Sequence, residues 1–301
     1  MKTFRKIVAM SAVTITVAAC SESELYVLGF GCHCTGQTTP MTVNEVTRQS
    51  YALTRSSAGK ETLTIGDAIG LWIDDGVNVT YDGVQYDNLR LDNTDDGWKM
   101  AEYVPLTKTA ATVYAFYPYD AKMTGTEVTL QLADDTDYLQ DVVTGISSAS
   151  PSVSLSMKHL RAKLSVRIHR GTYTGTGLIS SGIIEGSSLS VNGTYDLKTK
   201  KFASTDGISS VSMTGTVTGS DILEEEWYVF SKFGTAISPL SFTFTIDGKA
   251  FPTARSQESI EFESGKRYNY DITLNNQVAT VTAVSIEPWG NGVNEDISIT
   301  D

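Results

Sequence analysis

The chain of 301 residues has few cysteines, few histidines and a shortage of positive charge, and each shortage excludes a class of protein. It carries 23 Lys and Arg against 35 Asp and Glu, a formal net charge of −12. So acidic a chain lacks the basic face that nucleic acid requires. The segment Cys32-His33-Cys34 cannot surround a tetrahedral metal ion alone, because its ligands are adjacent in the chain. We therefore expect no nucleic-acid partner, no metal and no cofactor.

The chain also lacks the sequence motifs of common enzymes. It has no Gly-x-Ser-x-Gly elbow, no phosphate-binding loop and no His-Glu-x-x-His pair. Adjacent carboxylates such as Asp74 and Asp75 point to opposite faces of a strand, which makes them poor acid–base partners. We expect His159 to be a structural histidine at the start of a strand, bonded to a neighbouring loop, and His169 to be exposed at the end of that strand. No catalytic residue is predicted, and the protein is not expected to be an enzyme.

Long hydrophobic runs are absent except at the N-terminus, where a basic start precedes the uncharged stretch Ile7–Ala19. That length is too short for a transmembrane helix and typical of a signal peptide. Val17-Ala18-Ala19 leads into Cys20, which resembles the lipobox of bacterial lipoproteins and predicts lipid on Cys20. The Ser-Glu-Ser-Glu that follows, residues 21–24, resembles the export signal that sends Bacteroidetes lipoproteins to the cell surface. The alternative is an ordinary signal peptide with an incidental cysteine.

Most of the remaining chain predicts β-strands. Apolar and polar residues alternate with period two, the mark of a half-buried antiparallel strand. The clearest examples are Val128–Leu132, Val153–Met157, Leu164–Ile168 and Leu240–Ile246. Asp82-Gly83, Asn192-Gly193 and Asp247-Gly248 are typical of type I′ hairpin turns. No long stretch has a helical stripe, although Asp137–Val143 could form one turn of helix.

About fourteen short strands are too many for one small sandwich, so we predict two tandem antiparallel β-sandwiches. The Ser- and Pro-rich stretch Ser148–Ser156 marks the boundary between them. The predicted order is a signal peptide at 1–19, a tether or pro-segment at 20–56, an N-terminal sandwich at 57–152 and a C-terminal sandwich at 153–301. One strand near Met41–Val46 is expected within the tether.

Several stretches go beyond a generic β pattern, and together they resemble the fimbrillin-like proteins of Bacteroidales. These proteins are the lipoprotein-derived subunits of type V pili. The resemblance covers most of the chain from about residue 60 onward, and the order and spacing of the stretches carry it. They are Ile65–Trp72, Tyr86–Asn88, Trp98, Val113–Tyr119, Met157–Ile168, Gly265–Leu274 and Val284–Gly292.

The resemblance implies an all-β fold of two transthyretin-like Greek-key sandwiches and assembly into a fimbria at the cell surface. It also implies that an Arg-specific protease removes the N-terminal segment with its first strand, and that a strand from the next subunit fills the open groove. Arg48 and Arg55 are the candidate cleavage residues. We favour Arg55 because a serine-rich stretch follows it, although both could be ordinary solvated arginines.

Two segments near the C-terminus could supply the donated strand. Val281–Ile286 and Ile297–Ile299 both alternate, and Gly290-Asn291-Gly292 separates them. The alternative is that both are the last strands of the subunit's own sandwich. The sequence does not distinguish a tip, stalk or anchor subunit, and it names no surface receptor.

A second function remains open, that of a monomeric surface glycan-binding lipoprotein of a polysaccharide-uptake system. Such a protein would keep Cys20 and its whole chain without cleavage, and lipid on Cys20 would hold it at the outer membrane. It would also need exposed aromatic side chains for stacking on sugars. Tyr114, Phe116, Tyr117 and Tyr119 could form that platform or could pack in the core, and Trp289 could cap the end of a sandwich.

Overall fold

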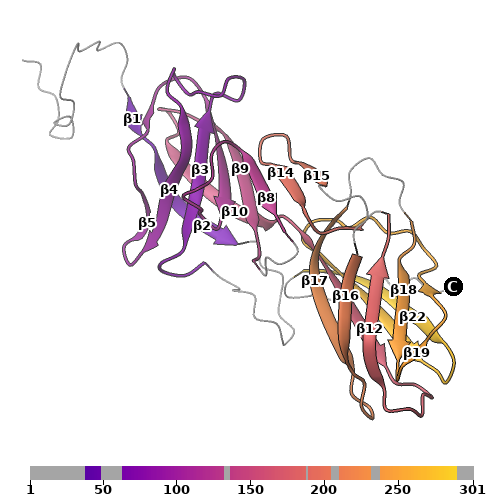
Figure 1. The fold of residues 1–301 in the computed structure, drawn as a ribbon. Coiled ribbons are helices and arrows are strands. Elements are labelled where there is room, and N and C mark those ends of the chain that lie inside the picture. The colour runs from indigo at the N-terminus through magenta and orange to yellow at the C-terminus, as the bar shows by residue number, and fades with distance from the viewer. Residues whose placement is uncertain are drawn as a thin grey trace, which may run out of the picture. The chain divides into compact units, whose positions relative to one another are not determined.

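The computed structural model describes residues 38–48, 63–131, 136–187, 189–204, 210–231 and 238–289 (Figure 1). Within these ranges every regular element is a β-strand, which confirms the all-β prediction. No helix in the described ranges is long and apolar enough to cross a membrane. Cys20, Cys32-His33-Cys34, Arg55 and Ile297–Ile299 lie outside the described residues.

The largest sheet has seven strands in the order β2-β10-β9-β7-β3-β4-β5. All its neighbours are antiparallel except β2 and β10, which run parallel. Its edge strands β2 and β5 contact each other, so the sheet curves around its own core. Strands β1 and β6 form a separate antiparallel pair. The bounds are β1 Thr39–Pro40, β2 Thr42–Arg48, β3 Ala68–Asp74, β4 Tyr86–Thr94, β5 Gly97–Met100, β6 Pro105–Leu106, β7 Ala111–Tyr117, β9 Leu139–Ile146 and β10 Ser152–His159.

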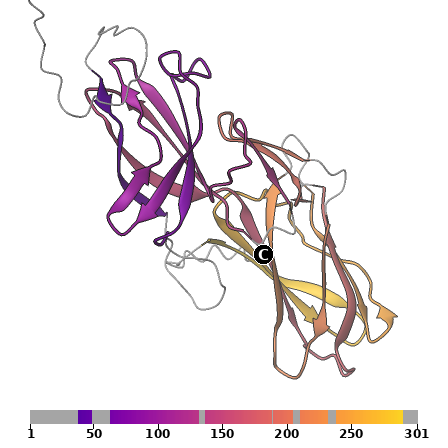
Figure 2. The ribbon, with the colours of Figure 1, turned by 60° about the vertical axis from the view of Figure 1, so that its left-hand side comes forward.

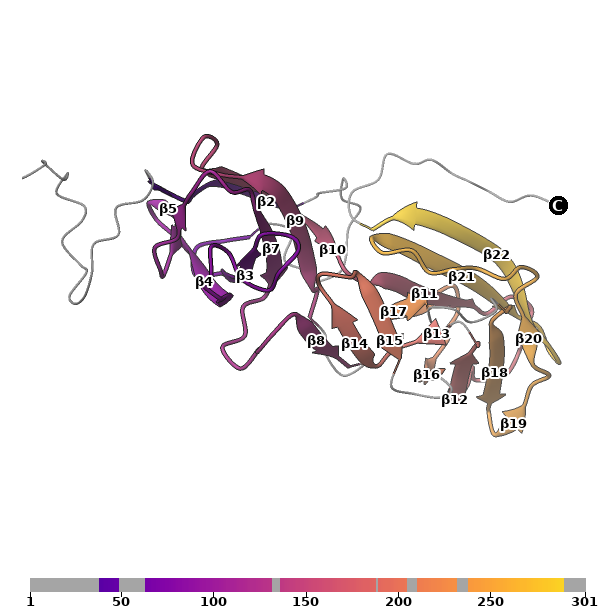
Figure 3. The ribbon, with the colours of Figure 1, turned by 90° about the horizontal axis from the view of Figure 1, so that it is seen from above.

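Two further sheets follow along the chain. One has the order β13-β17-β11-β21-β22, and the other has the order β16-β12-β18-β19, with β20 also paired to β18. Figure 3 shows β21 and β22 on one side of this region and β12 and β18 on the other. The bounds are β11 Ala162–His169, β12 Leu178–Glu185, β13 Leu189–Ser190, β16 Ser210–Thr216, β17 Leu223–Ser231, β18 Ser241–Ile246, β19 Lys249–Ala250, β20 Ala254–Arg255, β21 Lys266–Leu274 and β22 Ala279–Pro288.

A small third unit joins segments that lie far apart in the sequence. Strand β14 (Gly193–Asp196) pairs on one side with β15 (Lys201–Ser204) and on the other with β8 (Glu127–Leu130). Tyr195 lies opposite Val128 in this register. The unit therefore ties the chain before β9 to the chain after β12.

The alternating sequences bury one side of each strand, as hydrophobic burial requires. Along β10, Val153, Leu155 and Met157 are buried while the serines between them are exposed. One apolar core lies inside the seven-stranded sheet, and a second lies between the two five-stranded sheets. A third cluster lies beneath the small sheet and contains Trp72, Tyr114, Phe116, Tyr195 and Phe230, among others.

Four details of the sequence prediction are wrong. Leu139 begins strand β9 opposite Tyr117, so Asp137–Val143 does not form a helical turn. The antiparallel expectation fails where β2 pairs with β10 and where β11 pairs with β21. Asn192-Gly193 is not a hairpin turn, because β13 and β14 pair with different strands. His159 ends β10 and does not begin a strand.

Two turn predictions are confirmed. Asp82 and Gly83 have φ angles of 51° and 78°, and Asp247 and Gly248 have φ angles of 50° and 73°. A type I′ turn needs positive φ at both central residues. Asp82-Gly83 connects Tyr81 to Val84, and Asp247-Gly248 connects β18 to β19.

Candidate functional site

The first long strand, β2, lies at the margin of the seven-stranded sheet and is seen in indigo in Figure 2. It was predicted near Met41–Val46 and is found at Thr42–Arg48. Its partner is β10, with Thr42 opposite Ser152 and Arg48 opposite Met157. A register irregularity between Val153 and Ser154 interrupts the ladder. An edge strand with one partner contributes fewer backbone hydrogen bonds to the sheet than an inner strand does.

Few apolar side chains hold β2 and the residue before it. Met41 is 3% exposed, while Val43 and Val46 are only half-buried against the same core. A fully buried side chain of this kind contributes about 1.5–3 kcal/mol, and a half-buried one contributes less. Apolar burial therefore contributes little to holding β2, for a strand of its length.

Arg48, a predicted cleavage residue, ends β2 and is not a freely solvated arginine. Its guanidinium pairs with the Asp137 carboxylate, and the two side chains are only 10% and 11% exposed. The other oxygen of Asp137 lies 2.9 Å from Nδ1 of His159. The His159 side chain is 4% exposed, which confirms the prediction of a structural histidine bonded to a loop.

Trp289 completes this group, which we name the Arg48 cluster: Arg48, Asp137, His159 and Trp289. The rings of His159 and Trp289 stack with centroids 4.2 Å apart and planes 16° apart. Trp289 is 8% exposed, and its backbone N–H donates to the carbonyl of Gly265 at 2.6 Å. It lies at the end of a sandwich, in line with the expectation of an end cap.

Cationic and aromatic side chains surround the Arg48 cluster. Arg161 is 1% exposed and lies between two rings, 4.9 Å from the centroid of Tyr138 and 4.3 Å from that of Tyr228. Nζ of Lys163 lies 5.0 Å from the Trp289 centroid. Cations over aromatic faces are favourable, more so away from water. Close by, burial and the neighbouring Asp67 carboxylate raise the pKa of Tyr117 to about 12.

Sequence reasoning missed Asp137 as a partner of Arg48. The two residues are 89 positions apart, and Asp137 lies just before a strand in a stretch that reads as weakly helical. Only the arrangement of β2, β10 and β9 as neighbours brings them together. A charged residue beside the end of a strand gives no local signal of its partner.

The structure places the two candidate donor segments differently. Val281–Ile286 belongs to β22, which pairs with β21 from Lys266 opposite Pro288 to Leu274 opposite Ala279. This segment is therefore a strand of its own sandwich, the alternative that the sequence left open. Ile297–Ile299 lies outside the described residues.

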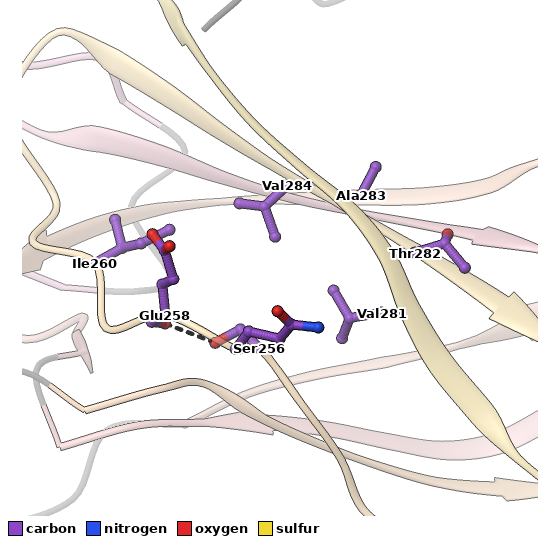
Figure 4. A pocket seen from close by; sticks show the side chains of 8 residues that line it. Ser256, Glu258, Ile260, Val281, Thr282, Ala283 and Val284 are labelled. Atoms are coloured by element: carbon purple, nitrogen blue, oxygen red, sulfur yellow. Dashed lines mark hydrogen bonds between the residues drawn. The ribbon is translucent and has the colours of Figure 1, made fainter. Parts of the chain in front are cut away.

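A shallow groove runs beside β22 (Figure 4). Its volume is about 120 Å³, and it lies between residues 256–260 and Val281–Val284. Ile260, Val281 and Val284 form its apolar part and pack on the second core. Ser256 Oγ donates to the Glu258 carbonyl at 3.1 Å on the opposite wall. The groove follows the margin where β22 ends one sheet and β20 lies in the other.

The outer face of the β17-β11-β21-β22 region carries a network of charged pairs. Arg267 pairs with Glu224 at 2.7 Å and also with Glu226. Asp271 accepts from Arg167 at 2.6 Å and pairs with Nε2 of His169 at 2.7 Å. His169 is thus partly exposed at the end of its strand, but it is paired. The Asp271 contacts link the adjacent strands β11 and β21, and the Arg267 contacts reach across β11 to β17.

The aromatic residues proposed as a sugar platform divide between core and surface. Tyr114 is 9% exposed and Phe116 is 1% exposed, both in the third apolar cluster. The hydroxyl of Tyr117 donates to Asp67 at 3.2 Å. Tyr119 lies beneath the Arg90 guanidinium, 5.1 Å from its ring centroid. Tyr114 and Phe116 confirm the core alternative, whereas Tyr117 and Tyr119 are partly exposed.

Comparison with solved structures identifies the fold. A candidate cell adhesion protein from Bacteroides ovatus matches with a TM-score of 0.60 and 17% identity, over 86% of this chain and 100% of that chain. A candidate cell adhesion protein from Bacteroides uniformis matches with a TM-score of 0.54 and 21% identity, over 84% of this chain and 99% of that chain. Likeness at such low identity shows a shared fold.

The tip fimbrial protein Mfa3 from Porphyromonas gingivalis, solved with a C-terminal truncation, matches with a TM-score of 0.46 and 11% identity. That match covers 75% of this chain and 95% of the Mfa3 chain. No curated protein matches in sequence. The family model described as fimbrillin-like, however, matches residues 54–289. The chain therefore belongs to the fimbrillin-like family.

Proposed function

We propose that the chain is a structural subunit of a surface fimbria, exported as a lipoprotein through Cys20 and assembled by strand donation. The observation that carries the proposal is membership of the fimbrillin-like family across residues 54–289. In this proposal an Arg-specific protease cuts at Arg55 or Arg48 and frees the N-terminal segment with β2. The subunit then leaves its lipid behind and joins other subunits, with a further role in adhesion to a surface receptor.

The fine architecture that we propose is two tandem transthyretin-like sandwiches that divide after His159, at the β10–β11 corner. The sequence placed the boundary at 152/153, but β10 packs on the core of the seven-stranded sheet. The separate apolar cores before and after the β10–β11 corner support this division. The small β8-β14-β15 sheet would then bridge the two domains. Such a bridge would keep the C-terminal domain in place while the N-terminal domain exchanges its first strand.

The edge position of β2 and its few apolar contacts favour its removal from the sheet. Its strand partner in the described chain is β10, and its apolar contacts with the core come from Val43 and Val46, next to Met41. The Arg48–Asp137 pair holds its end. Without β2, the backbone N–H and C=O groups of β10 would face an open slot. A strand from another subunit would restore the hydrogen bonds and fill the apolar positions with alternate side chains.

The donor is then the segment after Trp289, since Val281–Ile286 already pairs within its own sheet. Ile297 and Ile299 have the period-two spacing that would place both side chains in the slot, with Ser298 facing outward. A donated strand of this kind would hold a polymer without covalent links.

Matched substitutions in the tail test the proposal. Ile297→Asp with Ile299→Asp should abolish polymers on the cell surface, because two carboxylates cannot enter an apolar slot unpaired. Ser298→Asp is the control and should leave polymers intact, because its side chain faces outward. Electron microscopy and sedimentation of the surface fraction measure the outcome. Equal polymer from both variants would rule out this segment as donor.

A glycan-binding lipoprotein is the rival function, and it needs an exposed aromatic platform. Tyr114 and Phe116 are buried, so two of the four side chains considered for that platform cannot stack on a sugar.

A further inference from the structure

The Arg48 cluster connects the end of the first strand to the root of the C-terminal segment. Its contacts run from Arg48 to Asp137, from Asp137 to His159 at 2.9 Å, and from His159 to Trp289 at 4.2 Å between ring centroids. The four residues come from the end of β2, the loop before β9, the end of β10 and the position directly after β22. Residues 290–301 follow directly after Trp289.

Each contact fixes the next one. A carboxylate paired with an arginine only accepts hydrogen bonds, so Nδ1 of His159 must carry a proton to donate to Asp137. That hydrogen bond holds the plane of the imidazole ring, and the ring plane is what stacks on Trp289. The three titratable or charged side chains are at most 11% exposed, so water does little to replace a lost partner. A buried carboxylate that loses its cation becomes unfavourable where it stands.

Trp289 is in turn the last residue of the described chain, and several contacts hold it. Its backbone N–H donates to the Gly265 carbonyl at 2.6 Å. Its ring centroid lies 5.1 Å from the Tyr228 centroid and 5.0 Å from Nζ of Lys163. Without the His159 ring on its face, Trp289 would keep only contacts on the side of Tyr228 and Lys163. The stacking therefore decides how firmly the root of the tail is held.

We propose that the Arg48 cluster is a latch in which β2, while in place, holds Trp289 and the root of the C-terminal segment down. When β2 leaves, Arg48 leaves with it, Asp137 loses its cation and turns toward water, and His159 loses the bond that orients its ring. Trp289 is then released. The latch rests on the proposed function, because it assigns a consequence to the loss of β2.

The same geometry assigns cleavage to Arg55. A protease must bind the arginine side chain and an extended backbone, but the Arg48 side chain is held by Asp137 and its backbone lies opposite Met157 in the sheet. Cleavage at Arg48 would need β2 to detach first. Cutting after it, at Arg55, leaves the latch closed until β2 is displaced.

Hydrogen exchange of the full, unprocessed chain tests the latch, with the Trp289 amide as the reporter. Arg48→Ala and Asp137→Asn should each make that amide exchange about tenfold faster, the coupling expected for residues in one contact network. Arg48→Lys keeps the charge and should restore much of the protection. Arg90→Ala, which removes an exposed pair with Asp92 in the same sheet, is the matched control and should change nothing at Trp289.

A double substitution shows whether the effect passes through the histidine. His159→Phe keeps an aromatic ring against Trp289 but cannot bond Asp137. In that background Arg48→Ala should no longer change the exchange of Trp289. The latch is overturned if Arg48→Ala and Asp137→Asn leave Trp289 protection unchanged while β11 and β21 stay protected. It is also overturned if the Arg48→Ala effect persists in His159→Phe.

These measurements need neither protease nor polymer, so they separate the two proposals. If the protein forms polymers but Arg48→Ala does not change the exchange of Trp289, the latch is wrong and the fimbrial role stands. Coupling in a chain that never polymerises would leave the latch and remove strand donation.

Discussion

Tyr268, at the scale of a single residue, closes the turn that leads into β21. Its side chain is 1% exposed, and its hydroxyl accepts from the Glu263 N–H and donates to the Glu261 carbonyl, both at 2.8 Å. Burial raises the pKa of Tyr268 to about 12. An unfolded tyrosine ionises near pH 10, so between pH 10 and 12 the unfolded chain loses a proton that the folded chain keeps. The free energy of unfolding therefore falls with pH across this window.

Tyr268→Phe should expose this linkage. At pH 7 the variant should be less stable by about 1 kcal/mol, because two backbone hydrogen bonds are lost. The difference from the native protein should narrow above pH 10, since phenylalanine has no proton to lose. Urea unfolding at pH 7, 10 and 11 measures both effects. Tyr103→Phe, at a tyrosine that is 62% exposed, is the control. A difference that stays constant with pH would contradict the account.

Other residues show what a sequence can and cannot reveal at this scale. Asn192-Gly193 was predicted as a hairpin turn, but Gly193 is needed because a Cβ there would collide with the Phe202 ring and the Ala203 carbonyl. Asp137 carries no local mark of its long-range ion pair. By contrast, Asp247-Gly248 is confirmed because a type I′ turn depends only on the residues within it. A turn that depends only on its own residues was predictable from the sequence. Contacts between segments far apart in the chain were not.

At the scale of elements, the two terminal strands of the described chain differ in how firmly they are held. Strand β2 pairs with β10 through six residue pairs of a parallel ladder, whereas β22 pairs with β21 through nine residue pairs of an antiparallel ladder, and each ladder has one register irregularity. Period-two alternation located β10, β11 and β18 from the sequence alone, since each buries one face. Alternation does not say which strands are neighbours or whether they run parallel. The pairing of β2 with β10 therefore had to come from the structure.

Val46→Asp should loosen β2 selectively. Val46 lies opposite Leu155 and is half-buried against the first core, so a carboxylate there would be partly removed from water against apolar neighbours. We expect a loss of about 1–3 kcal/mol in the free energy of unfolding and faster proteolysis of 38–48. Asn44→Asp, on the exposed side of the same strand, should change neither. Equal loss from both variants would mean that β2 is not seated by its apolar side chains.

At the scale of the whole molecule, the family and the all-β fold were predictable because the motifs and strand patterns span most of the chain. The fimbrillin-like family match over residues 54–289 agrees with that reading. Lipid on Cys20, cleavage at Arg55 and donation of Ile297–Ile299 concern chain outside the described residues, and they stay predictions from the sequence.

The intact mass and N-terminal residue of the protein from the native cell surface test the central claim most directly. The account predicts a chain that begins at Ser56 and carries no lipid, because the protease cuts after Arg55 and the segment with β2 departs. A chain that begins at Gln49 would mean cleavage after Arg48. That result would be compatible with strand donation but would contradict the inference that the Asp137 pair and the sheet protect Arg48 from the protease. A chain still beginning at an acylated Cys20 would contradict the account, since the first strand would remain and no slot would open.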